Sequence, residues 1–383
     1  MPSYHRQGET PRKRHQVFRQ KSGELYAEEL VGNMGFTGPA SLLYHVHRPT
    51  AVKALRSIDE IKWNAVDHPL RHRHFRTRRF EERTSAITGR IPLLFNRDVS
   101  MSIVNPVESE TGFYRNAQGD EVVYVSEGAG MLATPFGKIE FRDGDYLVIP
   151  RGILHQYRFT KAARLLVIES AGYVRTPKRY RNEYGQLTEN APYSERDFRR
   201  PVDLETHDER GEFPLIVKKG DQFTELVMAH HPFDVVGWDG YYYPWAFSIH
   251  DFEPRVGRFH LPPPIHQTFE GDGFVICSFC PRPYDFDESA VPAPYAHANV
   301  MSDEVLYYAN SEFMSRTGIE YGSVTLHPDG LSHGPQPGRT EASLGQKQTN
   351  ELAVMLDTFR PLHVSQEALR VEDEGYYLSW TKE

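Results

Sequence analysis

The residues between 295 and 334 include the side-chain types that hold divalent metals. His297, the adjacent acids Asp303 and Glu304, His327 and His333 are separated by strand-like runs and turn residues. Two imidazoles and one carboxylate on adjacent strands can bind a divalent metal on one face and leave other coordination positions open. Such a set suits non-haem Fe(II) acting on O2, although zinc or manganese would also fit. We therefore expect a metal-dependent enzyme built around this segment.

An internal repeat relates this segment to an earlier one. Residues 144–155 and 322–333 carry Gly, Pro, Gly and His at the same offsets, and residues 120–124 match residues 303–307. Two copies of one small β unit therefore lie about 180 residues apart. A Gly turn and a short strand followed by Pro and His resemble the second cupin motif. Two such copies in one chain predict a bicupin.

The repeat also favours one of the two candidate carboxylates. Neighbouring side chains on a strand point to opposite faces, so only one of Asp303 and Glu304 can face a metal. Glu304 aligns with Glu121 of the first copy, which makes Glu304 the predicted ligand. The first copy keeps Glu121 and His155 but has no histidine upstream of the glutamate. Two ligands hold a divalent metal poorly, so we expect that copy to be a structural remnant.

A second histidine cluster lies just upstream of the predicted metal site. Residues 258–269 include His260, three consecutive prolines at positions 262–264, and His266. Prolines stiffen the backbone, so a side chain presented there is held in place. A rigid histidine near a metal can act as a general base toward a phenol, because its ordinary pKa lies near neutral pH. The alternative is a proline loop whose histidines only bond backbone groups.

Composition limits the partners and the compartment. The chain has 383 residues and a net charge of −8, from 44 basic and 52 acidic residues, so there is no general attraction to nucleic acid or anionic membranes. No apolar run approaches the roughly 20 residues of a membrane helix, and we expect a cytoplasmic protein. The basic run 71–79 is interpreted as a solvated strand face or subunit contact. Cys277 and Cys280 lie in a strand-like run and are predicted to be buried and reduced.

Short runs rich in Val, Ile, Tyr and Phe must position these residues. From about residue 91 onward such runs are separated by Gly, Pro, Asn and Asp, which is typical of sandwiches and barrels. Earlier in the chain, residues 24–31 could form a short helix or a docking segment. We predict an all-β fold, a bicupin-like double jelly roll or β-sandwich with few short helices. Its expected domains are a β domain with the degenerate copy (1–225) and a metal-binding cupin domain (226–383).

Most of the chain is similar to the homogentisate 1,2-dioxygenases, a family of ring-opening Fe(II) enzymes in the cupin superfamily. The Val-Val-Gly-Trp-Asp-Gly and His-Gly-Pro pieces are the specific ones. Compared with better-known animal members, the chain is shorter and the interval from His297 to Glu304 is one residue longer. Phe313 stands where those members carry a pocket tyrosine. We identify the chain as a shorter, bacterial-type member. The matching segments are residues 25–30, 35–37, 232–240, 333–335, 355–358 and 376–380.

The resemblance implies the reaction and the roles of the site residues. Fe(II) would serve as cofactor and O2 as co-substrate, with homogentisate opened to maleylacetoacetate in tyrosine and phenylalanine breakdown. Family members assemble as hexamers from trimers, so a homo-oligomer is expected. There are two alternatives. One is a related dioxygenase that acts on gentisate or another hydroquinone, and the other is a bicupin that binds a ligand without turnover. The family's metal ligands fall on His297, Glu304 and His333. Its proton-handling residue falls on His260, and its substrate-binding residues fall on Tyr295 and His327.

Overall fold

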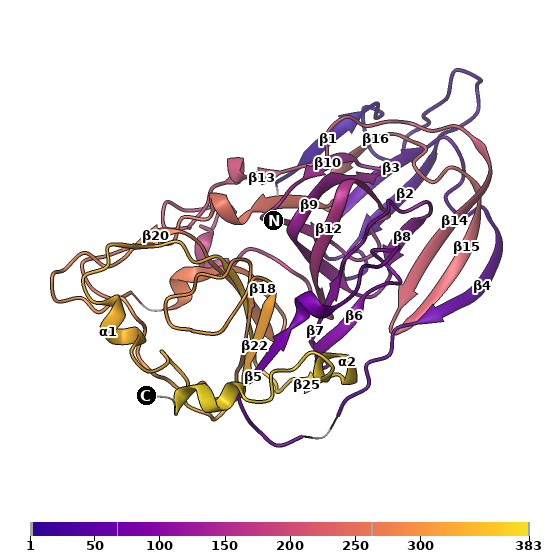
Figure 1. The fold of residues 1–383 in the computed structure, drawn as a ribbon. Coiled ribbons are helices and arrows are strands. Elements are labelled where there is room, and N and C mark those ends of the chain that lie inside the picture. Colours follow the sequence, from indigo (N-terminus) through magenta and orange to yellow (C-terminus); the bar gives the residue numbers. More distant parts are fainter. Residues whose placement is uncertain (1–2, 67, 262, 382–383) are drawn as a thin grey trace.

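Strands dominate the structure. The computed structural model describes residues 3–66, 68–261 and 263–381, and within them the only α-helices are α1 (Arg339–Ser343) and α2 (Gln366–Leu369). Short 3-10 turns, including η5 (Pro263–His266) and η6 (Tyr376–Trp380), complete the helical structure that concerns the site. The prediction of an all-β, bicupin-like fold with few short helices is confirmed (Figure 1).

The first half of the chain is built on a nine-stranded sheet. Its central strand β9 is hydrogen-bonded to β11 on one side and β12 on the other. Strand β10 (Gly137–Phe141) pairs with β9 outside the main path. In spatial order the strands are β13 (Phe198–Arg199), β17 (Trp245–Ser248), β11 (Asp145–Ile149), β9 (Asp120–Thr134), β12 (Gln156–Ser170), β7 (Val99–Val104), β6 (Ile91–Phe95) and β25 (His363–Val364).

Two smaller sheets lie farther from the predicted metal residues. The first has the order β1 (His5–Gly8), β16 (Val235–Gly240), β3 (Ala40–His45) and β2 (Ala27–Gly32). The second has the order β4 (Val52–Glu60), β15 (Gln222–His230), β14 (Arg210–Lys219) and β8 (Phe113–Asn116). The later part of residues 24–31 belongs to strand β2, so of the two possibilities considered there the short helix is wrong. Alternation favours the strand, because Leu30 is exposed while both its neighbours are partly buried.

A six-stranded sheet carries the predicted metal residues. It has the order β18 (Gln267–Gly271), β19 (Phe274–Phe279), β24 (Ala353–Thr358), β21 (Asp303–Tyr308), β22 (Ser323–His327) and β5 (Arg73–Arg76). A two-stranded ribbon of β20 (Arg282–Pro283) and β23 (Gln348–Thr349) lies beside it. Strand β5 comes from the first half of the chain, and β25 from the end of the chain joins the nine-stranded sheet (Figure 1). The boundary at residues 225/226 stays a prediction.

The basic run 71–79 is not a solvated face. Arg73 and His74 are each only 1% exposed. Nη1 of Arg73 lies 2.6 Å from the Glu372 carboxylate, and the ring of His74 contacts the Ser323 hydroxyl at 2.8 Å. Glu372 neutralises the buried guanidinium, and edge pairing with β22 covers the backbone. The interpretation as a solvated strand face is therefore wrong for β5, because tertiary partners supply the charges that the local sequence lacks.

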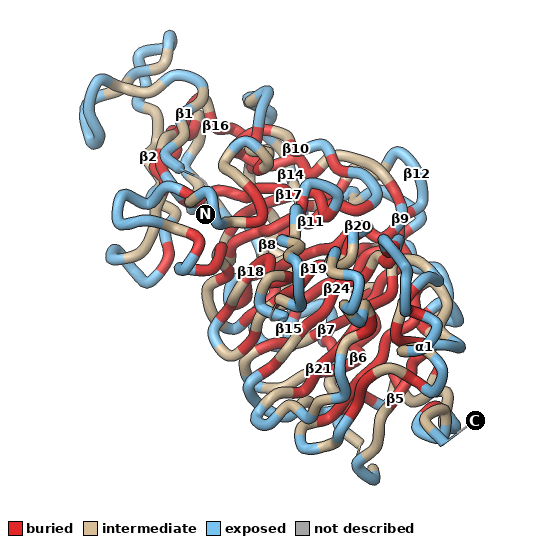
Figure 2. Tube along the Cα trace, turned by 90° about the vertical axis from the view of Figure 1, so that its left-hand side faces the viewer, coloured by how far each residue is buried: buried red, intermediate tan, exposed pale blue. Residues whose placement is uncertain are grey.

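The core is continuous between the two large sheets. On β9, Val122 and Tyr124 pack toward the six-stranded sheet, whereas Val123 and Val125 pack in a second cluster on the other face. Both faces of this strand are therefore buried, which explains its unbroken apolar run. The hydroxyls of Tyr146 and Ser278 meet at 2.8 Å between the halves. Buried residues concentrate along the strands (Figure 2).

Two smaller expectations can also be checked against the structure. Cys277 and Cys280 are each 3% exposed and unpaired, so the prediction of buried, reduced cysteines is confirmed. Among the described residues, no helix has the length and apolar character that crossing a membrane requires.

Candidate metal centre

The fold brings His297, Glu304 and His333 together. The backbones of His297 and His333 form an antiparallel bridge, with two N–H···O hydrogen bonds of 2.8 Å each. Glu304 lies next to them on β21. One potential ligand atom from each of the three side chains lies within 4.8 Å of the other two. Among the residues that the structure describes, no other group of three or more metal-binding side chains comes this close.

Both histidines are oriented by their own backbone. Nδ1 of His297 lies 3.2 Å from the carbonyl oxygen of Tyr295, and Nδ1 of His333 lies 3.1 Å from that of Leu331. A carbonyl can only accept, so each Nδ1 carries the proton and each Nε2 keeps a free lone pair. These Nε2 atoms lie 3.7 and 3.5 Å from the carboxylate of Glu304. Nε2 of His333 is buried without a hydrogen-bond partner, so its lone pair is available to a metal.

Glu304 is held as a carboxylate. Burial alone would raise its pKa, but the neighbouring imidazoles of His297, His327 and His333 keep the pKa well below its usual range. The closest contact is Nδ1 of His327, at 2.8 Å from Oε1. An ionised carboxylate facing two imidazole lone pairs fits a divalent cation. The donor set is also consistent with zinc or manganese.

Asp303 points away from this centre. Its carboxylate accepts the backbone N–H of Asp329 and that of Leu362, both at 2.7 Å. Asp120 has the equivalent contacts in the first copy, to the N–H groups of Arg151 and Val174 at 3.1 and 2.9 Å. The aspartate of each repeat therefore fastens loops, and the following glutamate faces the interior. This geometry supports the choice of Glu304 that the repeat suggested.

The first copy repeats the geometry with different chemistry. Tyr114 and His155 form the backbone bridge that corresponds to His297 and His333. Glu121 is fully buried, and Arg90 reaches its two oxygens with two bonds of 2.8 Å, while the Tyr114 hydroxyl donates to it at 2.7 Å. Burial would raise the pKa of Glu121, but Arg90 lowers it to about 2. A guanidinium thus supplies the positive charge that a bound metal would supply in the second copy.

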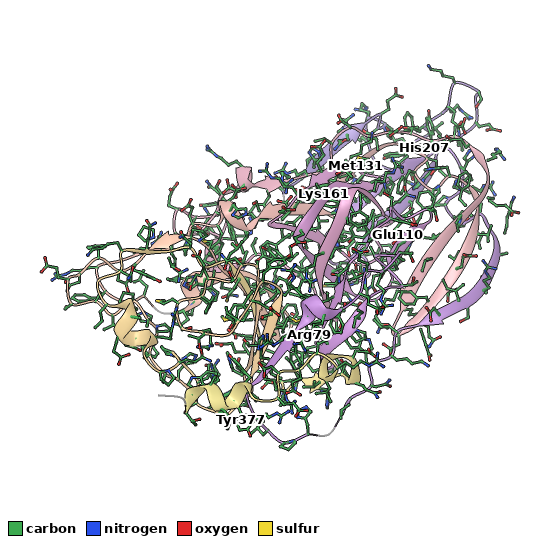
Figure 3. The ribbon with its side chains drawn as sticks, viewed as in Figure 1. Arg79, Glu110, Met131, Lys161, His207 and Tyr377 are labelled. Atoms are coloured by element: carbon green, nitrogen blue, oxygen red, sulfur yellow. The ribbon has the colours of Figure 1, made fainter. Side chains whose placement is uncertain are left out.

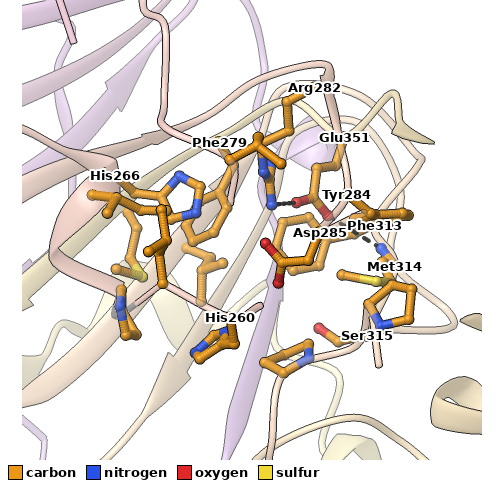
Figure 4. A pocket seen from close by; sticks show the side chains of 18 of the residues that line it. His260, His266, Phe279, Arg282, Tyr284, Asp285, Phe313, Met314, Ser315 and Glu351 are labelled. Atoms are coloured by element: carbon orange, nitrogen blue, oxygen red, sulfur yellow. Dashed lines mark hydrogen bonds and ion pairs between the residues drawn. The ribbon is translucent and has the colours of Figure 1, made fainter. Parts of the chain in front are cut away.

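A pocket borders the candidate metal site. Its lining includes His297, Glu304 and Gly334, together with His260 on the loop before η5. Apolar side chains, among them Phe279 and Phe313, cover the middle (Figure 4). An apolar lining with a few polar and ionisable side chains is typical of small-molecule sites.

The predicted general base and substrate residues take different positions. His260 is exposed, lines the pocket, and its ring centre lies 5.2 Å from that of Tyr295, which is 60% exposed. His327 is fully buried behind Glu304 and is not part of the pocket lining, and neither is Tyr295. Pro262 lies outside the described residues, so the three-proline segment is seen only through Pro263 and Pro264, which open η5.

Several residues at this centre were not anticipated. The ring of His72 lies 5.5 Å from that of His327 and 5.0 Å from Trp380. Trp380 donates its indole N–H to the Gly334 carbonyl at 3.1 Å, and Arg316 lines the pocket beside it. In the same turn η6, Tyr377 faces outward (Figure 3). No motif spacing identifies these residues, because they come from a basic run, a loop and the C-terminal end of the chain.

The fold and this centre define a class of protein, cupin-like and all-β. The second half of the chain has a His-Glu-His site, and the first half has a copy of it in which an arginine supplies the positive charge. The family model described as homogentisate 1,2-dioxygenase N-terminal matches residues 6–249. A provisionally named dioxygenase of Saccharolobus solfataricus is 44% identical, covering 99% of each chain. The homogentisate 1,2-dioxygenase of Bradyrhizobium diazoefficiens is 30% identical over 67% of this chain and 59% of its own length.

The chain therefore belongs to the homogentisate 1,2-dioxygenase family, and the resemblance expected from the sequence is confirmed. Membership makes it a protein of a dioxygenase family. Among solved structures, a cupin 2 conserved barrel domain protein from Leptotrichia buccalis aligns with a TM-score of 0.35 and 11% identity. That alignment covers 82% of this chain and 100% of the other.

Proposed function

We propose that the protein is an Fe(II)-dependent dioxygenase that converts homogentisate and O2 to maleylacetoacetate. The observation that carries the proposal is the convergence of two imidazole lone pairs and one ionised carboxylate beside a pocket. His297, Glu304 and His333 would hold the iron. Bound there, Fe(II) would supply open positions at which the aromatic ring and O2 meet.

The remaining residues would bind and orient the substrate. His260 lies on the pocket wall with its ring accessible, so it is our candidate for taking the phenolic proton. Phe279, Leu306 and Met355 would hold the ring and exclude water. His327 would act indirectly, by fixing the Glu304 carboxylate through its 2.8 Å hydrogen bond. Tyr295 would reach the substrate from its position beside His260, 5.2 Å away between ring centres.

The proposed reaction is balanced by O2 alone. The ring bond between the hydroxyl-bearing carbon and the carbon that carries the acetate arm breaks. Both oxygen atoms enter the product, so no further reductant is needed. Holding ring and O2 on neighbouring positions can lower the barrier by several kcal/mol. We also propose a cytoplasmic location and a homo-oligomeric state, trimer or hexamer.

The test is anaerobic loading with Fe(II), followed by homogentisate and O2, with oxygen uptake and the ring-opened product measured together. We expect one O2 consumed for each maleylacetoacetate formed. A panel with gentisate and other hydroquinones distinguishes a relative of different specificity, a candidate favoured by Phe313 in the pocket lining. Absence of bound iron and of oxygen uptake with every compound would instead indicate a bicupin that binds without turnover.

A further inference from the structure

Arg316 is a buried cation at the metal end of the pocket. It is 6% exposed, lines the pocket, and donates from Nη1 to the carbonyl of Gly334, the residue after His333, at 2.6 Å. Its other hydrogen bonds go to the carbonyl and hydroxyl oxygens of Ser315, both at 3.2 Å, and to the hydroxyl of Tyr376. The guanidinium also lies over the ring of Trp380, 5.4 Å from the ring centre. These contacts fix it beside His333.

Arg316 forms no salt bridge with the described residues, and the Glu304 carboxylate acts on it only from a longer distance. Two other buried arginines are paired, Arg73 with Glu372 at 2.6 Å and Arg90 with Glu121 at 2.8 Å, whereas the buried Arg164 bonds only neutral oxygens. The partly buried Arg282 pairs with Glu351 at 2.6 Å (Figure 4). Neutral oxygens and an aromatic face are all that Arg316 contacts, and its Nε–H is buried without a hydrogen-bond partner. A buried guanidinium without a counter-charge is costly.

We propose that Arg316 binds the carboxylate of the substrate and thereby selects acidic hydroquinones over neutral ones. An arginine donates to a carboxylate through several N–H groups in a fixed plane, and the bond is strong where water is excluded. Such a ligand would accept hydrogen bonds from the guanidinium and bring a negative charge to an arginine that has no salt bridge. This inference rests on the proposed function in one respect, that the pocket takes a dihydroxylated aromatic ring.

Binding to the Zn(II)-loaded protein tests this without any turnover. Calorimetry would compare homogentisate with 2-methylhydroquinone, which keeps the two hydroxyls and replaces the acetate arm by a methyl group. We expect the unaltered protein to bind homogentisate about 10- to 100-fold more tightly, the range for a hydrogen bond to a charged group. Arg316→Met should lose most of that preference and bind 2-methylhydroquinone as before. Arg316→Lys should retain part of the preference.

Arg56→Met, a substitution of an exposed arginine on β4, serves as the matched control and should change neither affinity. Equal affinity of the unaltered protein for the acid and the neutral compound would overturn the inference, even if Arg316→Met does not fold. A parallel loss of both ligands in folded, metal-replete Arg316→Met would also overturn it, because that pattern indicates a structural role.

The outcome is separable from that of the proposed function. If the protein turns over homogentisate and Arg316→Met keeps the preference for the acid, the proposed function is supported and the role of Arg316 is contradicted. If there is no turnover but binding of the acid still depends on Arg316, the proposed function is contradicted and the role of Arg316 is supported.

Discussion

The guanidinium of Arg90 and the carboxylate of Glu121 form a fully buried pair, joined by two bonds of 2.8 Å, in the copy of the repeat that corresponds to the metal centre. The pairing explains how the first half of the chain can keep the cupin geometry without a metal. The positive charge comes from the protein itself, and Tyr114 stands where the second copy has His297.

Removing that charge should destabilise the fold. In Arg90→Met, Glu121 stays buried without its partner, and we expect the free energy of unfolding to fall by about 3–5 kcal/mol. Urea unfolding followed by fluorescence measures the loss. The double variant Arg90→Met/Glu121→Leu should recover a large part of it. The iron content should stay unchanged in both folded variants, and a loss of iron in either would contradict a purely structural role.

The two adjacent acids should behave differently toward metal. Glu304→Ala removes the carboxylate that faces the imidazoles and should abolish stoichiometric Fe(II) binding. Asp303→Asn should keep the metal and lower stability by about 1–3 kcal/mol, because one carboxylate oxygen that accepts a backbone N–H becomes an amide donor. Metal analysis after anaerobic loading decides the matter. Full iron content in Glu304→Ala would rule out that residue as the ligand.

His327 should affect the metal only indirectly. In His327→Phe the 2.8 Å hydrogen bond to Glu304 is lost, and we expect Fe(II) affinity to fall about 10- to 100-fold, the range found for outer-shell partners. Competition with a chelator of known affinity measures this. If His327 contacts substrate instead, the variant will keep its iron affinity and lose affinity for homogentisate.

His260 and His266 provide a matched pair on the pocket wall. Burial lowers the pKa of His266 to about 3, so it is a poor base at neutral pH. His260→Gln should keep its iron and lose about 10²- to 10⁴-fold in kcat, the usual contribution of a general base. His266→Gln should lose much less. Equal losses in kcat would argue for a packing role of both residues.

Stability should fall at alkaline pH because of His45. Burial would lower its pKa, but hydrogen bonds to Asp234 at 2.7 Å and Glu29 at 3.1 Å raise it from 6.5 to about 9. Because the pKa of His45 is higher in the folded state, its protonation stabilises the fold. This contribution is complete below pH 6.5 and is lost as the pH rises through 9. The contribution is up to about 3 kcal/mol. Unfolding of His45→Gln should lack this decline, and an identical pH profile would contradict the assignment.

The sequence by itself determined the fold class, the family and the likeness of the two halves. Gly, Pro and His at repeated offsets carry that information locally, because turns and strand ends need those residue types. The same repeat selected Glu304 over Asp303, since alternation along a strand allows one of two neighbours to face inward.

Tertiary structure alone decided which charges meet. Glu121 lies 31 residues from Arg90, and Arg73 lies 299 residues from Glu372, so no local pattern shows that either pair is neutralised. His327 lies behind the carboxylate because β22 pairs with β21. His72, Arg316 and Trp380 come from three distant parts of the chain, and only tertiary packing brings them to the centre. Burial and long-range pairing set the electrostatics of the site, and neither is encoded in residue spacing.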